Sequence, residues 1–156
     1  MQMETTKCLS RLQRLCSRAE YCRSDMRRKA LRDLEGDETA ADAVVEALVR
    51  ERYVDDARYS RAFAREKASL QGWGPMKIRF QLRGKGIAEA TIDAALEEVD
   101  EGSAADKLER LLAARARQLE GDPQLRLKLL RYALGRGYAY DQVEEALARL
   151  KDASRQ

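Results

Sequence analysis

The sequence predicts an all-α protein. Among its 156 residues only two are proline and 6% are aromatic, while alanine, leucine, arginine and glutamate are abundant. This composition favours helices over strands. No stretch of convincing length alternates apolar and polar residues as a half-buried strand does, whereas apolar residues recur at helical spacing. We therefore expect helices joined by short breaks that contain glycine or proline.

The expected helices fall into three groups along the chain. Their approximate ranges are 5–20, 26–34, 40–52, 55–70, 75–83, 89–99, 103–121, 123–135 and 141–151. We assign three helices each to an N-terminal unit (1–52), a central unit (53–100) and a C-terminal unit (101–156).

An internal repeat supports this division. Ile92 and Leu96 have apolar counterparts 51 positions later, Val143 and Leu147. The first unit matches less well, although residues 24–27 are similar to residues 74–77 as a helix start. We predict three tandem three-helix repeats stacked into an elongated, curved body, because three short helices alone bury little apolar surface.

Particular residues mark the expected helix starts. Asp55 is a suitable N-cap, because its carboxylate can accept from free N–H groups. Pro75 takes a first helical position, where its missing N–H has no intrahelical partner to lose. Ser24 is expected to cap the second helix, and Thr39 with Asp42 has the spacing of a capping box for the third.

Residues 53–87 contain the densest signal. YVDDARYSRAF is followed by GWGPMKIRFQLRGKGI, which combines an acidic helix start, an aromatic pair, a Gly-Trp-Gly-Pro break and a closing Lys-Gly-Ile in order. This stretch resembles the central repeat of the RecX family, bacterial regulators of the RecA recombinase. The similarity extends over about residues 20–150.

The resemblance implies a function and a partner. It implies a protein that binds in the groove of the RecA filament on single- or double-stranded DNA, and that blocks filament extension or promotes filament loss. RecA's ATP hydrolysis, strand exchange and co-protease activity would thereby be restrained. Such a protein would act in homologous recombination, DNA repair and the SOS response, without a cofactor. We expect it to be a cytoplasmic monomer.

The charge distribution suggests where such a partner would bind. The second helix of each unit is basic and the third is acidic, and no acidic residue occurs between Lys67 and Ala88. We therefore expect three basic helices to line one side and to meet phosphates or an acidic protein groove. Arg79 and Arg83 are the first candidates for contact and Arg27 the next. The full set is Arg27, Arg28, Lys29, Arg32, Lys77, Arg79, Arg83, Lys85, Arg126, Lys128 and Arg131.

Two features have both a structural and a functional interpretation. Trp73 lies between two glycines before a proline, where it can plug a joint between helices or stack on a nucleobase. The acidic residues Glu97, Glu98, Asp100 and Glu101 have the composition of a nuclease metal cluster, or of a solvated helix end. We favour packing for Trp73 and solvation for the acidic residues.

Several classes of protein do not fit this sequence. The chain has no histidine, no glycine-rich phosphate loop and no Gly-x-Ser-x-Gly turn, so we do not expect an enzyme. Cys8, Cys16 and Cys22 form no Cys-x-x-Cys pair, which favours reduced, partly buried thiols over a zinc site. No apolar run approaches the roughly 20 residues of a membrane span.

A second functional class remains open from the residues alone. The chain can also be a DNA-binding protein that acts without RecA, for example a helix-turn-helix regulator. Such regulators use one recognition helix and are commonly symmetric dimers. Nothing in the sequence distinguishes one helix in this way.

Overall fold

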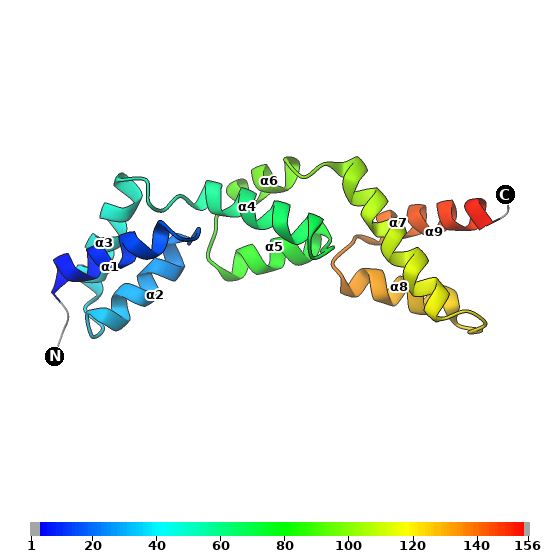
Figure 1. Ribbon diagram of the computed structural model, residues 1–156, viewed down its shortest axis with the longest axis horizontal. Helices are drawn as coiled ribbons and strands as arrows, with labels where there is room; N and C mark the ends of the chain where they lie inside the picture. Colours follow the sequence, from blue (N-terminus) through cyan, green and yellow to red (C-terminus); the bar gives the residue numbers. More distant parts are fainter. Residues whose placement is uncertain (1–3, 155–156) are drawn as a thin grey trace.

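The computed structural model describes residues 4–154, which form nine α-helices and no strand. The molecule is elongated, and consecutive groups of three helices follow one another along its long axis (Figure 1). The N-terminal group contains α1 (Thr5–Cys16), α2 (Arg23–Asp33) and α3 (Glu38–Arg50). The central group contains α4 (Asp56–Ser69), α5 (Pro75–Gly84) and α6 (Glu89–Glu97). The last group contains α7 (Glu101–Gln118), α8 (Leu125–Gly135) and α9 (Tyr140–Ser154). The predicted all-α fold is confirmed.

Each group of helices encloses its own hydrophobic cluster. Met26 and Leu48 are buried in the first cluster, Ile78 and Ile92 in the second, and Leu112 and Val143 in the third. Each repeat therefore has a hydrophobic cluster, and neighbouring repeats also contact each other, for example through α4 and α7. We infer that 1–52, 53–100 and 101–156 are structural units that exchange core residues at the first boundary, since Val54 packs into the first cluster and Cys22 into the second.

Most helix starts follow local chemistry, but two caps differ from the prediction. Asp55 caps α4 by accepting from the N–H of Arg58, and Pro75 opens α5, both as expected. The cap of α3 is Asp37, which accepts from the N–H of Ala40, rather than Thr39. Ser24 lies inside the first turn of α2, whose N-cap is Cys22.

Corresponding segments form the joints between units. The start of a second helix meets the turn between the second and third helices of the next unit. At the second joint, the N–H of Gly74 donates to the carbonyl of Arg136 (2.8 Å) and that of Met76 to Gly137 (2.9 Å). The two backbones approach so closely that a Cβ on Gly74 would collide with the carbonyl group of Gly137. The hydroxyl of Tyr138 also donates to the carbonyl of Gly72 (3.1 Å).

The first joint is held by side-chain hydrogen bonds, whereas the second also has hydrogen bonds between the two backbones. The hydroxyl of Ser24 donates to the carbonyl of Lys85 (2.7 Å), and the ammonium group of Lys85 donates to Asp25 (2.7 Å). Buried residues give the alignment of these units, because Met26 and Ala30 face inward on α2 as Ile78 and Leu82 do on α5. Arg27 therefore corresponds to Arg79, and the expected match of residues 24–27 with 74–77 is wrong by two positions.

Candidate functional site

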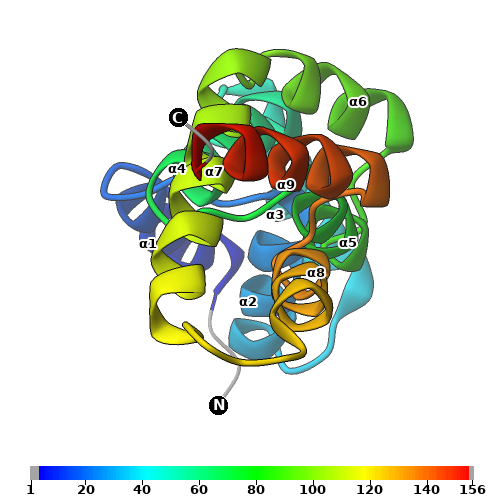
Figure 2. The same cartoon turned by 90° about the vertical axis from the view of Figure 1, so that its right-hand side faces the viewer.

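The second helices α2, α5 and α8 lie along one edge of the molecule (Figure 1). An end-on view shows α5 and α8 nearly in line with α2 beside them, whereas α6 and α9 lie toward the opposite edge (Figure 2). All predicted contact residues are on these three helices or directly follow one of them. The shared edge is therefore the first candidate for a partner-binding surface.

Two of the predicted cations on α5, Arg79 and Arg83, form ion pairs with acidic residues. Arg79 forms ion pairs with Glu89 (2.9 Å) and Asp93 (2.8 Å) of α6, and Arg83 also pairs with Glu89. The hydrogen bond from Arg83 lowers the pKa of Glu89 below its usual range and raises that of Arg83. The expectation that these arginines lack a nearby acid is wrong, because the carboxylates come from the next helix rather than from the same stretch of sequence.

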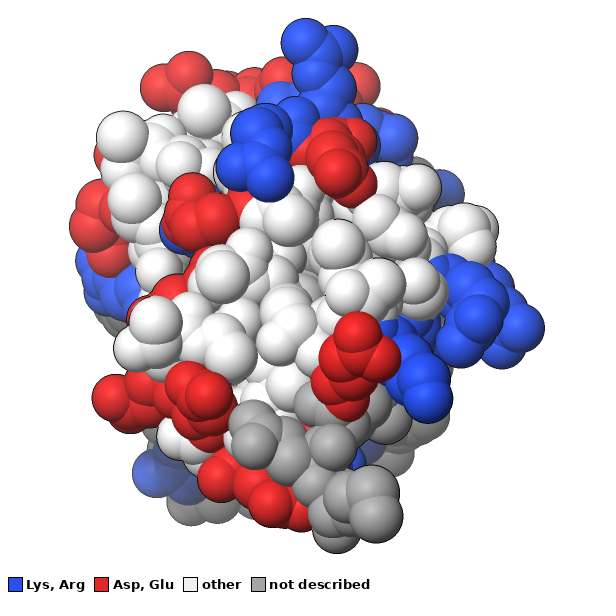
Figure 3. Space-filling model, turned by 90° about the vertical axis from the view of Figure 1, so that its left-hand side faces the viewer, with Lys and Arg blue, Asp and Glu red and all other residues white. Residues whose placement is uncertain are grey.

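The other units repeat this pairing of a basic second helix with acidic residues. In the first unit Arg27 pairs with Asp42 (2.8 Å) and Arg28 with Asp25 (3.2 Å). The remaining pairs are Arg27–Glu38 (3.8 Å), Lys85–Asp25 (2.7 Å), Arg126–Glu144 (2.6 Å) and Lys128–Asp122 (2.5 Å). The end of the molecule formed by the first unit likewise shows acidic side chains among the basic ones (Figure 3).

Four predicted cations have no carboxylate partner within residues 4–154. The ammonium group of Lys77 lies 4.5 Å from the ring centroid of Trp73, and that of Lys29 lies 5.6 Å from the ring of Tyr21. Arg32 and Arg131 are exposed. The edge therefore presents scattered free cations among neutralised pairs.

Exposed apolar side chains on α5 and α8 were missed by the sequence reasoning. Phe80 is 71% exposed and Met76 60%, and on α8 Leu127 and Leu134 are 40% and 41% exposed. These residues lie outside the inward-facing rows of their helices. Met76 and Leu127 hold equivalent places in the 51-residue repeat. The helical spacing could have predicted their exposure. Met76 and Phe80 share one face of α5, four residues apart, and each lies two positions before an inward-facing residue, Ile78 or Leu82.

Trp73 contributes to packing at the second joint. Its half-buried ring meets Phe63 edge-on, with centroids 6.1 Å apart. Lys67 and Lys77 both place their ammonium groups near the ring. This arrangement supports the interpretation of Trp73 as a plug between helices.

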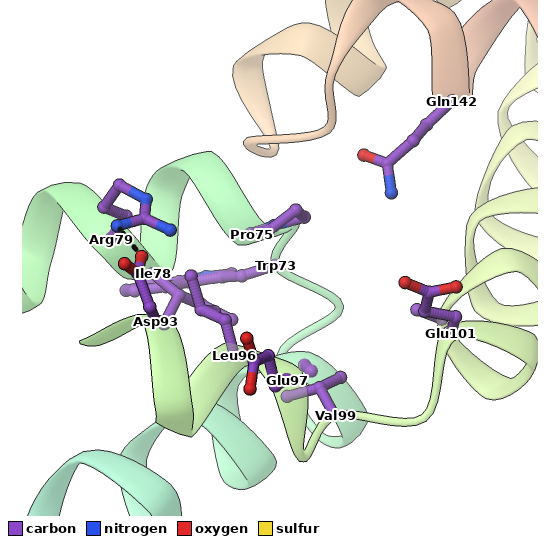
Figure 4. Close-up of a pocket in the computed structure, with 12 residues that line it drawn as sticks. Trp73, Pro75, Ile78, Arg79, Asp93, Leu96, Glu97, Val99, Glu101 and Gln142 are labelled. Carbon is purple, nitrogen blue, oxygen red and sulfur yellow. Dashed lines mark ion pairs between the residues drawn. The ribbon is translucent and has the colours of Figure 1, made fainter. Parts of the chain in front are cut away.

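A cleft opens between the central and C-terminal units beside Trp73. It has a volume of about 380 Å³, and its lining includes Trp73, Ile78 and Leu96. The Arg79–Asp93 pair lies on one side, and Glu101 and Gln142 of the next unit lie on the other (Figure 4). The cleft is therefore a gap between units that carries both apolar and acidic groups.

Other expected features involve thiols, carboxylates and apolar runs. Burial, with a hydrogen bond to Asp33, raises the pKa of Cys8 to about 11, so this thiol stays protonated at neutral pH. Burial also raises the pKa values of Cys16 and Cys22. Within residues 4–154 no three cysteine or acidic side chains converge on a possible metal position. None of the described helices combines the length and apolarity needed to cross a membrane.

Comparison with known proteins places this architecture in a family. The family model described as "RecX, second three-helix domain" matches residues 55–96. A protein named "Regulatory protein RecX" from Chromohalobacter salexigens is 34% identical over 139 residues, which cover 86% of this chain and 87% of that protein. This chain belongs to the RecX family. A RecX protein from Halorhodospira halophila is also 34% identical, over 86% of this chain and 83% of its own length. The resemblance identified at residues 53–87 is confirmed, and the chain has a regulatory role of the RecX type.

Solved RecX structures have the same fold. A crystal structure of regulatory protein RecX aligns with a TM-score of 0.83 and 24% identity, over 92% of this chain and 71% of that one. RecX from Lactobacillus salivarius aligns with a TM-score of 0.82 and 20% identity, over 94% of this chain and 96% of that one. The tandem arrangement of three-helix units is therefore a fold that this chain shares with other RecX proteins.

Proposed function

We propose that this RecX-family chain binds the RecA–DNA filament and restrains RecA's ATP hydrolysis, strand exchange and co-protease activity, either by blocking extension or by promoting disassembly. Family membership supports a regulatory role in recombination and DNA repair. The observation that carries the binding surface is the shared edge of α2, α5 and α8, which extends along an elongated body (Figure 1).

The chemistry of this edge suits a partner made of both protein and nucleic acid. Phe80, Met76 and Leu127 are apolar side chains left in solvent, and burying such side chains against a protein surface favours association. Lys77 and Arg131 lie on the same helices and have no carboxylate partner within the described chain. Arg79 and Arg83 instead fix α5 against α6, so their role in binding is to position the helix.

A comparison of three DNA states tests this function. Binding of the full chain is measured to bare single-stranded DNA, to bare duplex and to RecA-coated DNA at physiological salt, together with RecA's ATPase rate. We expect preference for the coated DNA and a fall in the ATPase rate. Preference for one bare duplex sequence, with an unchanged ATPase rate, would instead identify a regulator that acts without RecA.

A single substitution tests the edge itself. Phe80→Ala should weaken binding to RecA-coated DNA by about tenfold, because it removes an aromatic anchor that the folded monomer does not need. Leu70→Ala is the control, since Leu70 is 75% exposed and is the C-cap of α4, outside the three second helices. Equal effects of the two substitutions would exclude α5 as the contact helix.

A further inference from the structure

A second basic surface lies away from the shared edge, in a groove between α4 and α7. The groove has a volume of about 390 Å³ and is formed where the central and C-terminal units pack on each other. α4 contributes Arg65 and Ser69, which are four residues apart on one helical face. α7 contributes Ser103, Lys107 and Arg110 with similar spacing.

The three cations of this groove differ from those of the second helices. Arg65, Lys107 and Arg110 have no ion pair or side-chain hydrogen bond within residues 4–154. Because they come from two helices that face one groove, their positive charges add rather than cancel.

The two carboxylates in the lining are already engaged. Glu98 pairs with Arg61 (3.7 Å), and Asp100 caps α7 by accepting from the N–H groups of Gly102 (2.9 Å) and Ser103 (3.3 Å). Neither forms an ion pair with the groove cations, and three cations face Asp100 and an already paired Glu98. The groove keeps an excess of positive charge that an incoming anion can meet.

We propose that this groove binds the phosphate backbone of a nucleic-acid strand. Arginine and lysine are the usual phosphate ligands, and a serine hydroxyl such as that of Ser103 can donate to a phosphate oxygen. The hydroxyl of Ser69 already donates to the carbonyl of Arg65 (2.6 Å). The apolar part of the lining consists of Ala68, Val99 and Ala104, with no aromatic side chain on which a base could stack. The groove therefore holds a strand without reading its sequence.

This inference rests on the proposed function, because the proposed function identifies the bound strand as the DNA of the RecA filament. It adds a DNA contact on the first helices of two units, while the shared edge of second helices remains available to protein. A filament-bound chain would thus have a DNA contact in the groove that is separate from its contacts at the shared edge. The two surfaces can be tested separately.

Salt-dependent binding to a labelled oligothymidine tests the groove. In the full chain, the triple variant R65Q/K107Q/R110Q should lose about tenfold in affinity, and the slope of log affinity against log salt should flatten by about 2, since each phosphate contact on a single strand contributes about 0.7. The control is R14Q/R18Q/R50Q, which removes the same charge from exposed positions of the first unit. The control should stay within about twofold of the unchanged chain.

Other results would overturn the proposal. Equal losses in both triple variants would mean that net charge, not the groove, attracts DNA. Displacement of the oligothymidine by free ATP at stoichiometric concentration would identify a nucleotide site. If polyglutamate displaced the oligothymidine as well as unlabelled DNA does, the partner of the groove would be an acidic protein. RecA ATPase is measured in parallel. If DNA binding depends on the groove but the chain does not affect RecA's ATPase rate, the proposed function alone is refuted. If the groove variant binds DNA as well as the unchanged chain and still inhibits RecA, the groove proposal alone is refuted.

Discussion

At the scale of single residues, Asp25 is the buried charge that joins the first two units. It is 5% exposed and accepts from Lys85 of the central unit and from Arg28 of its own helix. Burial by itself would raise its pKa, but hydrogen bonds from Lys85 and Cys22 outweigh burial, so the pKa lies below its usual value. A carboxyl group with a lowered pKa stabilises the fold once the pH exceeds its unfolded pKa.

Asp25→Asn should therefore destabilise the protein at neutral pH by about 2 kcal/mol, as is typical for a hydrogen bond to a charged group. The difference from the unchanged chain should shrink below about pH 4, because Asp25 itself is protonated as the pH falls through its lowered folded pKa. Urea unfolding at pH 7 and pH 3 measures this. A difference that is the same at both pH values would show that the carboxylate charge does not stabilise the joint.

At the scale of elements, each second helix has one buried face and one exposed face. Ile78 and Leu82 fix the inward face of α5, which leaves Phe80 toward solvent. The start of α5 is held by a different contact, the close approach of Gly74 to Gly137. Gly74 has φ −83°, a value that alanine adopts without strain, so only the contact requires glycine there.

Gly74→Ala should therefore break the second joint without straining its own backbone. We expect a loss of about 1–3 kcal/mol in unfolding free energy, as for other overpacked contacts, and faster hydrogen exchange at the Met76 amide. Gly135→Ala is the control, because its Cβ would meet nothing within 4 Å and should stabilise α8 by up to about 1 kcal/mol. Equal behaviour of the two variants would contradict the role of the joint.

At the scale of the whole molecule, three separate hydrophobic clusters follow one another along the chain. Units joined by turns and by the α4–α7 contact form an extended body rather than a globule. This shape allows one edge to follow a long, regular partner, while the α4–α7 groove is presented elsewhere.

Solution scattering checks the shape. A compact globule of this length has a radius of gyration of about 15 Å, so the tandem arrangement should give a clearly larger value. The measurement needs no partner. A radius of gyration close to 15 Å would mean that the units fold back on one another in solution.

Much of the fold was predictable because it depends on neighbouring residues. The spacing of Ile92 and Leu96, the cap at Asp55 and the break at Pro75 act within a few positions of the chain. The motif at residues 53–87 also identified the family, since its order of helix start, break and close is a local property. The prediction failed at helix starts with several possible capping residues, such as α3, where Thr39 was expected and Asp37 is the N-cap.

The sequence by itself determined the helices, their grouping in threes and membership of the RecX family. Only the tertiary structure decided which charges are free. Arg79 and Arg83 have no acid in their own stretch, yet packing of α6 against α5 brings Glu89 and Asp93 to them. Arg65 and Lys107, distant in sequence, line one groove because α4 packs on α7. Ion pairing acts over a few ångströms in space, so the availability of a charge depends on which helices pack together.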